Sequence, residues 1–287
     1  SRPKYLTKSR FRLALECPTK LSYTGKEEYP DTKVEDSFLE ALAEGGIQVG
    51  ELAKLYYPGG RDIKTLHKEE ALVETARYLD EDPVTLYEAA FRYGEFFVRA
   101  DILERRGDEI DLIEVKAKSC GFSDSAGFIN NGEYLKPKWI PYLYDVAFQT
   151  YVVRNAMPGY SVNPYLLLAD KNAEATVEGL NQRFLIRKGP DGRTEAVVRE
   201  GTTREDLGGE ILIAIDVSEI VKMIFEGKDS KEPREKPFGE WVEDLAKAYE
   251  EDWKIITFPG SHCKVCEFRA APEEKQEGKK SGFEECW

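Results

Sequence analysis

The stretch RADILERRGDEIDLIEVKAKS, Arg99–Ser119, decides the fold of this chain. Apolar and polar side chains alternate before and after Gly107-Asp108, as they do in half-buried β-strands. Glycine as the first residue of a two-residue connection suits a type II′ turn. The stretch therefore predicts an antiparallel hairpin, and its register decides which charged side chains meet.

The predicted turn fixes which residues face each other across the hairpin. Asp101 falls opposite Glu114. Residues two apart on a strand point the same way, so Asp101, Glu114 and Lys116 share one face. The other face is predicted to be continuously apolar, with three facing pairs: Ile102 and Ile113, Ala100 and Val115, and Val98 and Ala117.

Two opposed carboxylates repel each other and raise each other's pKa unless a cation lies between them. A divalent metal supplies such a cation, and ligands from carboxylates, a backbone carbonyl and water suit Mg²⁺ or Mn²⁺. A lysine beside the ion can position water and neutralise charge on a phosphate. The chemistry that this pattern would support is metal-assisted hydrolysis of phosphodiesters. On this segment alone, an ordinary hairpin with a solvated charged face is the favoured interpretation, so evidence for the metal site has to come from elsewhere in the chain.

Composition sets limits on the partners of the chain. Its 287 residues include 41% hydrophobic side chains, enough for a real core. The net charge of −13 excludes a protein that coats nucleic acid over its whole surface, which leaves a local basic groove. No long apolar run and no signal-peptide core are present. We therefore expect no membrane span and a cytoplasmic location.

The flanking sequence alternates between helical and strand patterns, which predicts an α/β fold. Helices are expected over 7–15, 34–57 with an interruption near Gly45-Gly46, 66–82, 139–157, 217–227 and 238–252. Strands are expected as a three-stranded antiparallel meander over 84–118, a buried strand over 161–170, and a hairpin over 183–200 that turns at Pro190-Asp191-Gly192.

Cysteines lie at both ends of the chain. Cys263 and Cys266 have the two-residue gap that lets both thiolates bind one metal ion or cluster. With Cys17 and Cys286 they make four thiolates, which suffice for a [4Fe-4S] cluster or a zinc ion. Such a site would close a very long loop around the β-core. Cys120 is interpreted as a free, partly buried thiol.

The N-terminal cysteine, the D…ExK hairpin, the glutamine-bearing helix with DVAFQTYVV and the C-terminal cysteine trio together resemble a known family. It is the RecB-like branch of the PD-(D/E)XK nuclease superfamily, in particular its iron–sulfur members such as the AddB nuclease domain and the CRISPR-adaptation exonucleases. The resemblance implies a restriction-endonuclease-like core, a mixed central β-sheet flanked by helices. It implies a nuclease-like domain over 1–260, with an N-terminal helical part, and a cysteine segment over 261–287.

The resemblance also implies roles for individual residues. Asp101, Glu114, Lys116 and Gln149 would be catalytic, with Gln149 supporting Lys116 or the DNA backbone. Asp101, Glu114 and the carbonyl of Val115 would bind Mg²⁺ or Mn²⁺. The [4Fe-4S] cluster would be held by Cys17, Cys263, Cys266 and Cys286.

The chain departs from the family pattern at the first helix. Gly50 stands where the family often has a histidine metal ligand, so Glu51 or Gln48 would replace it, or the third side-chain ligand is absent. Val153 stands at the tyrosine position of the Q-x-x-x-Y helix, with Tyr151 nearby. The main hypothesis is a DNA exonuclease, and the alternative is a catalytically degenerate nucleic-acid-binding or scaffold module.

Aromatic and basic residues are interleaved after the hairpin, a mixture that suits single-stranded nucleic acid. The candidate contacts are Lys118, Lys136, Lys138 and Tyr151. The expected partner is DNA, as single strands or duplex ends. A further domain or protein partner beyond the C-terminus is also expected.

Overall fold

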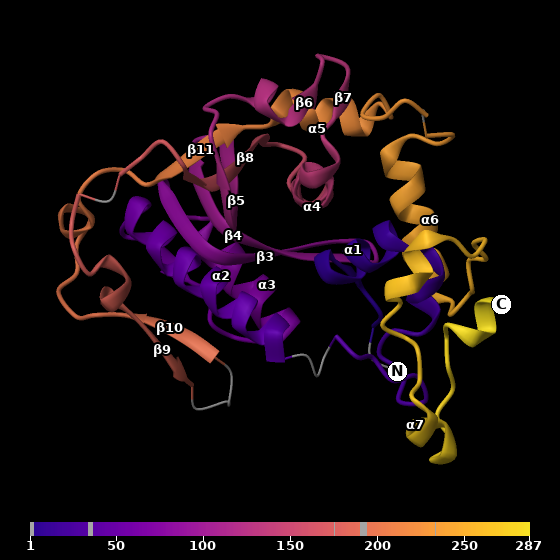
Figure 1. The fold of residues 1–287 in the computed structure, drawn as a ribbon. Helices are drawn as coiled ribbons and strands as arrows, with labels where there is room; N and C mark the ends of the chain where they lie inside the picture. The colour runs from indigo at the N-terminus through magenta and orange to yellow at the C-terminus, as the bar shows by residue number, and fades with distance from the viewer. Residues whose placement is uncertain (1–2, 34–36, 175, 190–193, 233) are drawn as a thin grey trace.

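The computed structural model describes residues 3–33, 37–174, 176–189, 194–232 and 234–287 (Figure 1). Its α-helices are α1 Lys8–Glu16, α2 Ser37–Tyr56, α3 Lys68–Tyr78, α4 Ile140–Ala156, α5 Ser218–Phe225, α6 Phe238–Glu250 and α7 Pro272–Gln276. Its strands are β1 Leu6–Thr7, β2 Arg61–Asp62, β3 Val84–Tyr93, β4 Phe96–Arg106, β5 Glu109–Cys120, β6 Ile129–Asn130, β7 Tyr134–Leu135, β8 Ser161–Asp170, β9 Phe184–Lys188, β10 Thr194–Val198 and β11 Leu212–Asp216.

Seven strands of the described residues form one mixed sheet in the order β11-β8-β5-β4-β3-β2, with β1 added on β4. β3, β4 and β5 are antiparallel neighbours, which confirms the predicted meander, whereas β5 and β8 are parallel. Helices α2 and α4 lie on opposite faces of this sheet (Figure 1). The predicted α/β class with a central mixed sheet flanked by helices is confirmed.

The predicted hairpin is present, but it is shorter than expected. Arg106 pairs with Glu109 across the two-residue turn, where Gly107 has φ +61, a value that favours glycine. The pairing follows the predicted register as far as Ile102 and Ile113 and then ends. The predicted backbone pairing of Asp101 with Glu114 is wrong, because β5 leaves β4 there and continues along β8.

The predicted continuous apolar face is also wrong, because β4 changes phase at Asp101. Ile102 and Ile113 pack in the cluster that α2 covers, whereas Val98 and Ala100 pack in the cluster under α4. Of their expected partners, Val115 borders the α2 cluster and Ala117 is exposed. The charged side chains of the strand therefore point toward the place where β4 and β5 stop pairing, which we call the break in the sheet, and not toward one solvated face.

Helical periodicity predicted α1, α3, α4, α5 and α6 close to their observed bounds. The predicted interruption of α2 at Gly45-Gly46 is wrong, since the helix runs through both glycines. Each glycine costs about 1 kcal/mol in a helix, and Leu52 and Ala53 offset this by packing in the core. The β9–β10 hairpin is confirmed, while its predicted turn at 190–192 lies outside the described residues.

The C-terminal segment packs around the short 3-10 helix that follows α1, Pro18–Ser22. Thr19 donates to the carbonyl of Ile255 at 2.7 Å. Lys20 forms an ion pair of 2.6 Å with Glu267, and both side chains are almost fully buried. Breaking such a buried pair is strongly destabilising, so this contact holds the two ends of the chain together (Figure 1).

Two further expectations concern the chain as a whole. The division into residues 1–260 and 261–287 stays a prediction. Among the helices of the described residues, none combines the length and the apolar content that crossing a bilayer requires.

Candidate active site

The break in the sheet lies along one edge of β4. On this edge β5 pairs with residues 102–106, and β1 pairs with Phe96 and Phe97. Among the described residues, the stretch between them has no strand partner on this edge. β1 runs directly into α1, whose first residue is Lys8. The chain therefore delivers the Lys8 side chain into the space that β4 and β5 leave between them.

Lys8 lies between the two carboxylates of the predicted site. Its Nζ is 2.9 and 3.0 Å from the two carboxylate oxygens of Glu114 and 3.7 Å from Oδ1 of Asp101. The cation that the sequence analysis expected between these carboxylates is, in the structure, an ammonium group. Burial opposes the charged form of Lys8, but Asp101 and Glu114 together raise its pKa.

The Asp101 carboxylate also replaces a missing backbone contact. Its Oδ2 accepts a hydrogen bond of 2.7 Å from the backbone N–H of Val115, a donor that β4 no longer pairs. Burial and the negative charge of Glu114 raise the pKa of Asp101 to about 7, against the opposing effect of Lys8. Asp101 is thus fixed in place and faces the same space as Glu114.

Glu114 is the most enclosed member of the site, with a side chain 1% exposed. Lys116 lies 2.5 Å from its Oε1, and the Gln149 amide donates to its Oε2 at 2.6 Å. Burial opposes ionisation, yet Lys8 and Lys116 hold the pKa of Glu114 below its usual range. Gln149 contacts Glu114 directly, whereas the sequence analysis expected it to support Lys116 or DNA.

Asp145 belongs to the same network, and the sequence analysis missed it. Its carboxylate, with no exposed surface, lies 3.2 Å from Nζ of Lys116 and 3.7 Å from Nε of Arg12. Asp145 precedes Gln149 by one helical turn and so lies on the same face of α4. This spacing could have indicated Asp145 from the sequence. The sequence did not show, however, that this face of α4 packs against β5.

Helix α1 is held against α4 by aromatic packing. The ring of Phe11 stacks on Phe148 with centroids 4.5 Å apart and an interplanar angle of 8°. Lys8 and Arg12 flank Phe11 on α1, one helical turn apart, so the same packing aims both cations at the site. Neither was predicted from the sequence, because their contacts join residues more than a hundred positions apart.

A cavity of about 510 Å³ opens in front of these groups. One wall of the cavity is lined by Asp101, Val115 and Lys116, and the other by Gly50 and Glu51 of α2. Glu51 is paired with Lys54 at 2.7 Å. An added side chain at Gly50 would meet open space. The structure therefore brings three of the predicted metal ligands, Asp101, Val115 and Glu51, to the lining of one cavity. The fourth, Glu114, is buried and is not among the described residues that line it.

Glu88 is a second residue of this cavity that the sequence analysis missed. It lies on β3 at the level of Asp101 and has φ +58, a backbone conformation that is unusual for glutamate. Its carboxylate lies 4.0 Å from Arg99, and burial raises its pKa. Unusual backbone at an acidic residue beside a cavity is a common feature of functional sites.

The four residues predicted to contact nucleic acid lie in different surroundings. Lys118 follows Lys116 along β5, and its Nζ lies 4.5 Å from the ring centroid of Tyr142. Lys138 is exposed beside Trp139, 5.6 Å from its ring. Lys136 donates to the carbonyl of Gly127, and the Tyr151 hydroxyl donates to Glu243 at 2.7 Å. None of the four is among the described residues that line the cavity.

The cysteines from the two ends of the chain share one end of the molecule. Sγ of Cys17 lies 3.3 Å from the Thr257 hydroxyl, and Sγ of Cys286 lies 3.4 Å from the Tyr23 hydroxyl. Across the described ranges, no three Cys, His, Asp or Glu side chains converge on one metal position. The segments that carry the predicted ligands are adjacent, while the thiols face separate neighbours.

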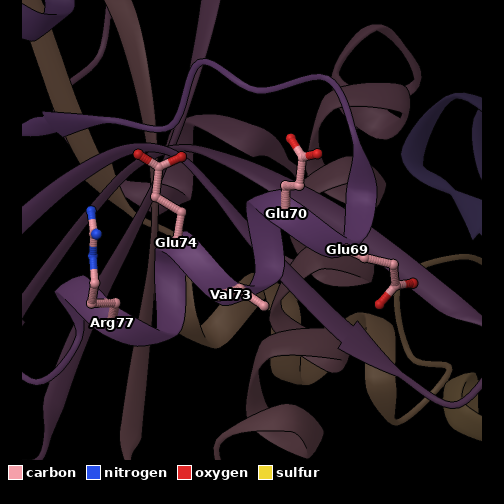
Figure 2. Close-up of a pocket in the computed structure, with 5 residues that line it drawn as sticks. All are labelled: Glu69, Glu70, Val73, Glu74 and Arg77. Carbon is pink, nitrogen blue, oxygen red and sulfur yellow. The ribbon is translucent and has the colours of Figure 1, made fainter.

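A hollow of about 500 Å³ on the outer side of α3 differs from the cavity at the break in the sheet (Figure 2). Figure 2 shows that the carboxylate of Glu69 points away from those of Glu70 and Glu74. Glu69 contacts the Tyr5 hydroxyl and Glu70 accepts from Thr65. These carboxylates are engaged separately, so the hollow offers no shared binding point.

Comparisons with known proteins add little to this geometry. No protein family matches the chain, and no curated protein matches it. One solved structure, titled "Crystal structure of SSO0001", is similar at 13% sequence identity with a TM-score of 0.23. The match covers 91% of this chain and 93% of that one. A likeness of this size carries no information about fold or function.

Proposed function

We propose that this protein is a Mg²⁺- or Mn²⁺-dependent phosphodiesterase that hydrolyses DNA, built on a restriction-endonuclease-like core. The observation that supports it is the convergence of Asp101 and Glu114 on one cation, with Lys116 beside Glu114 at 2.5 Å. These groups adjoin a cavity that is open to solvent. Two carboxylates and a lysine beside one cavity are the elements that metal-assisted phosphodiester hydrolysis uses.

The donor set fits a hard divalent cation, because two carboxylates already face one positively charged atom. Asp101, Glu114 and the carbonyl of Val115 would hold the ion, with Glu51 on the opposite wall. When bound, the ion would supply positive charge to the phosphate and lower the pKa of water. Hydrolysis joins the water oxygen to phosphorus and breaks one ester P–O bond, and the leaving oxygen takes up a proton. Lys116 would hold the attacking water and offset charge on the phosphate.

A second candidate is the catalytically degenerate module. Two observations favour it: the Lys8 ammonium already balances the two carboxylates, and glycine occupies position 50. In this case the acidic pair would be a buried ion network with a structural role, and the cavity would bind nucleic acid without cutting it.

Incubation with labelled DNA separates these two functions. Purified protein is mixed with end-labelled single-stranded and duplex DNA in Mn²⁺, Mg²⁺ or EDTA, beside the Asp101→Ala variant. We expect cleavage by the unmodified protein in Mn²⁺, none in EDTA, and a loss of at least about 100-fold in the variant. Equal background cleavage by both proteins would rule out the hydrolase.

We also propose that Cys17, Cys263, Cys266 and Cys286 bind a [4Fe-4S] cluster. The support is the ion pair of Lys20 with Glu267, which ties the residues after Cys17 to the residue after Cys266. Four thiolates from two segments held in this way match the ligand number of the cluster.

Anaerobically purified protein is expected to be brown, with broad visible absorption from thiolate-bound iron, and to contain iron and sulfide. The Cys263→Ser variant is expected to lose most of this absorption, while Cys120→Ser, which changes the buried thiol of β5, is expected to keep it. A colourless protein that contains zinc would contradict the cluster.

A further inference from the structure

Strand β5 and helix α4 meet through a regular row of side-chain pairs. Every second residue of β5 advances about 6.6 Å, and three or four residues of α4 advance about 4.5–6 Å. The spacings of side chains along β5 and α4 are therefore similar enough for three successive side-chain pairs to form, which we call the β5–α4 row. The nitrogen-to-oxygen distances are 2.6 Å for Gln149–Glu114, 3.2 Å for Lys116–Asp145 and 3.5 Å for Lys118–Tyr142.

The third pair of the β5–α4 row differs from the other two in charge. Lys118 donates to the carbonyl of Lys138 at 3.2 Å and lies over the rings of Tyr142 and Trp139, at 4.5 and 5.0 Å from their centroids. Within the part of the chain that the structure describes, no carboxylate forms an ion pair with it. A lysine held by aromatic rings without an acidic partner keeps its charge available for an anion.

Arg12 connects this third pair to the cavity. Its guanidinium lies 5.9 Å from the ring centroid of Tyr142 and contacts Asp145, and its side chain is 44% exposed. It also lines the cavity in front of Asp101 and Lys116. The ring of Tyr142 therefore lies near two cations: Arg12, which lines the cavity, and Lys118, which follows Lys116 by two residues on β5.

We propose that Arg12 and Lys118 bind the phosphate next to the scissile one, and that Tyr142 positions both cations. This inference rests on the proposed function. A single nucleotide of an extended strand can span the distance between Lys116 and Lys118 along β5. Successive phosphates would therefore contact successive lysines. Substrates with at least two neighbouring phosphates would then be preferred over an isolated phosphodiester.

The test compares two substrates in the same protein: a labelled oligodeoxythymidylate and bis(4-nitrophenyl) phosphate, which has a single phosphodiester. For Lys118→Ala we expect the ratio of kcat/KM for the oligonucleotide to kcat/KM for the small diester to fall about tenfold, mainly through KM. Lys222→Ala, which removes an exposed lysine of α5, is the matched control and should keep the ratio.

A second measurement uses binding alone. The affinity for the oligonucleotide is measured in Ca²⁺ at several salt concentrations, and one lost phosphate contact lowers the salt slope by about 1. Tyr142→Phe is expected to behave as the unmodified protein because the ring remains, whereas Tyr142→Ala should resemble Lys118→Ala.

The outcomes separate this inference from the proposed function. Cleavage of both substrates with an unchanged ratio and salt slope in Lys118→Ala would overturn the phosphate subsite and leave the hydrolase standing. Failure of the unmodified protein to cleave either substrate in Mn²⁺ would overturn the hydrolase itself. Should Tyr142→Ala fail to fold, Lys118→Ala alone decides.

Discussion

Replacing Lys116 by methionine is expected to lower metal-dependent DNA cleavage by about 100- to 1000-fold, the usual effect of removing one preorganised charge from a hydrolytic site. Lys116 lies between Glu114 and Asp145, at 2.5 and 3.2 Å, so two carboxylates hold its ammonium at the cavity wall. Because both attractions favour the charged form, against the effect of burial, the pKa of Lys116 is raised. A lysine that stays protonated suits a role in orienting water and offsetting phosphate charge.

The Lys116→Met experiment needs a metal-binding measurement beside the cleavage assay. Mn²⁺ binding, followed by calorimetry, is expected to persist in the variant, since Asp101 and Glu114 remain. Lys222→Met is the control for loss of one surface lysine. Retention of full cleavage by Lys116→Met, with folding verified by circular dichroism, would contradict a catalytic role for this residue.

Replacing Lys8 by methionine is expected to destabilise the metal-free protein by about 3 kcal/mol, since it removes one partner from a buried charge network. The value is at the lower end for a buried pair because the Lys8 side chain is 26% exposed. The variant leaves Asp101 and Glu114 facing each other with Lys116 as the nearest remaining cation. A divalent ion would then enter without displacing an ammonium group. Mn²⁺ is therefore expected to bind Lys8→Met at least about tenfold more tightly than the unmodified protein, a gain of about 1.4 kcal/mol.

Two measurements check the Lys8 prediction together. Urea denaturation in EDTA gives the loss of stability, and the same denaturation in Mn²⁺ should restore most of it through binding to the folded state. Lys4→Met is a suitable control from the same segment, because Lys4 lies at the surface. It forms an exposed pair of 3.9 Å with Asp252, and its ammonium lies 5.7 Å from the ring centroid of Tyr249. Equal Mn²⁺ affinity in Lys8→Met and the unmodified protein would exclude competition between the ammonium group and the metal.

The local pattern of the sequence was enough for most secondary structure. Alternation around Gly107-Asp108 gave the turn and the first part of the β4–β5 register, since period and turn type depend on neighbouring residues alone. The register failed at Asp101 because β5 stops pairing with β4 after Ile113 while it continues along β8, and β8 lies outside the hairpin. The predicted break of α2 at its glycines was wrong, because the packing of the helix against the sheet, which keeps it continuous, cannot be read from neighbouring residues alone.

The residues of the candidate site also fall into two groups, those that the sequence predicted and those that only the structure placed there. The sequence by itself predicted Asp101, Glu114 and Lys116, whose spacing lies within one hairpin, and the family resemblance added Gln149. Only the tertiary structure placed Lys8, Arg12 and Asp145 among them, by bringing α1 and α4 to the break in the sheet. The physical reason is that strand and helix periods fix the direction of a side chain relative to its own element. Which cation balances a buried carboxylate depends on elements that are distant in the chain.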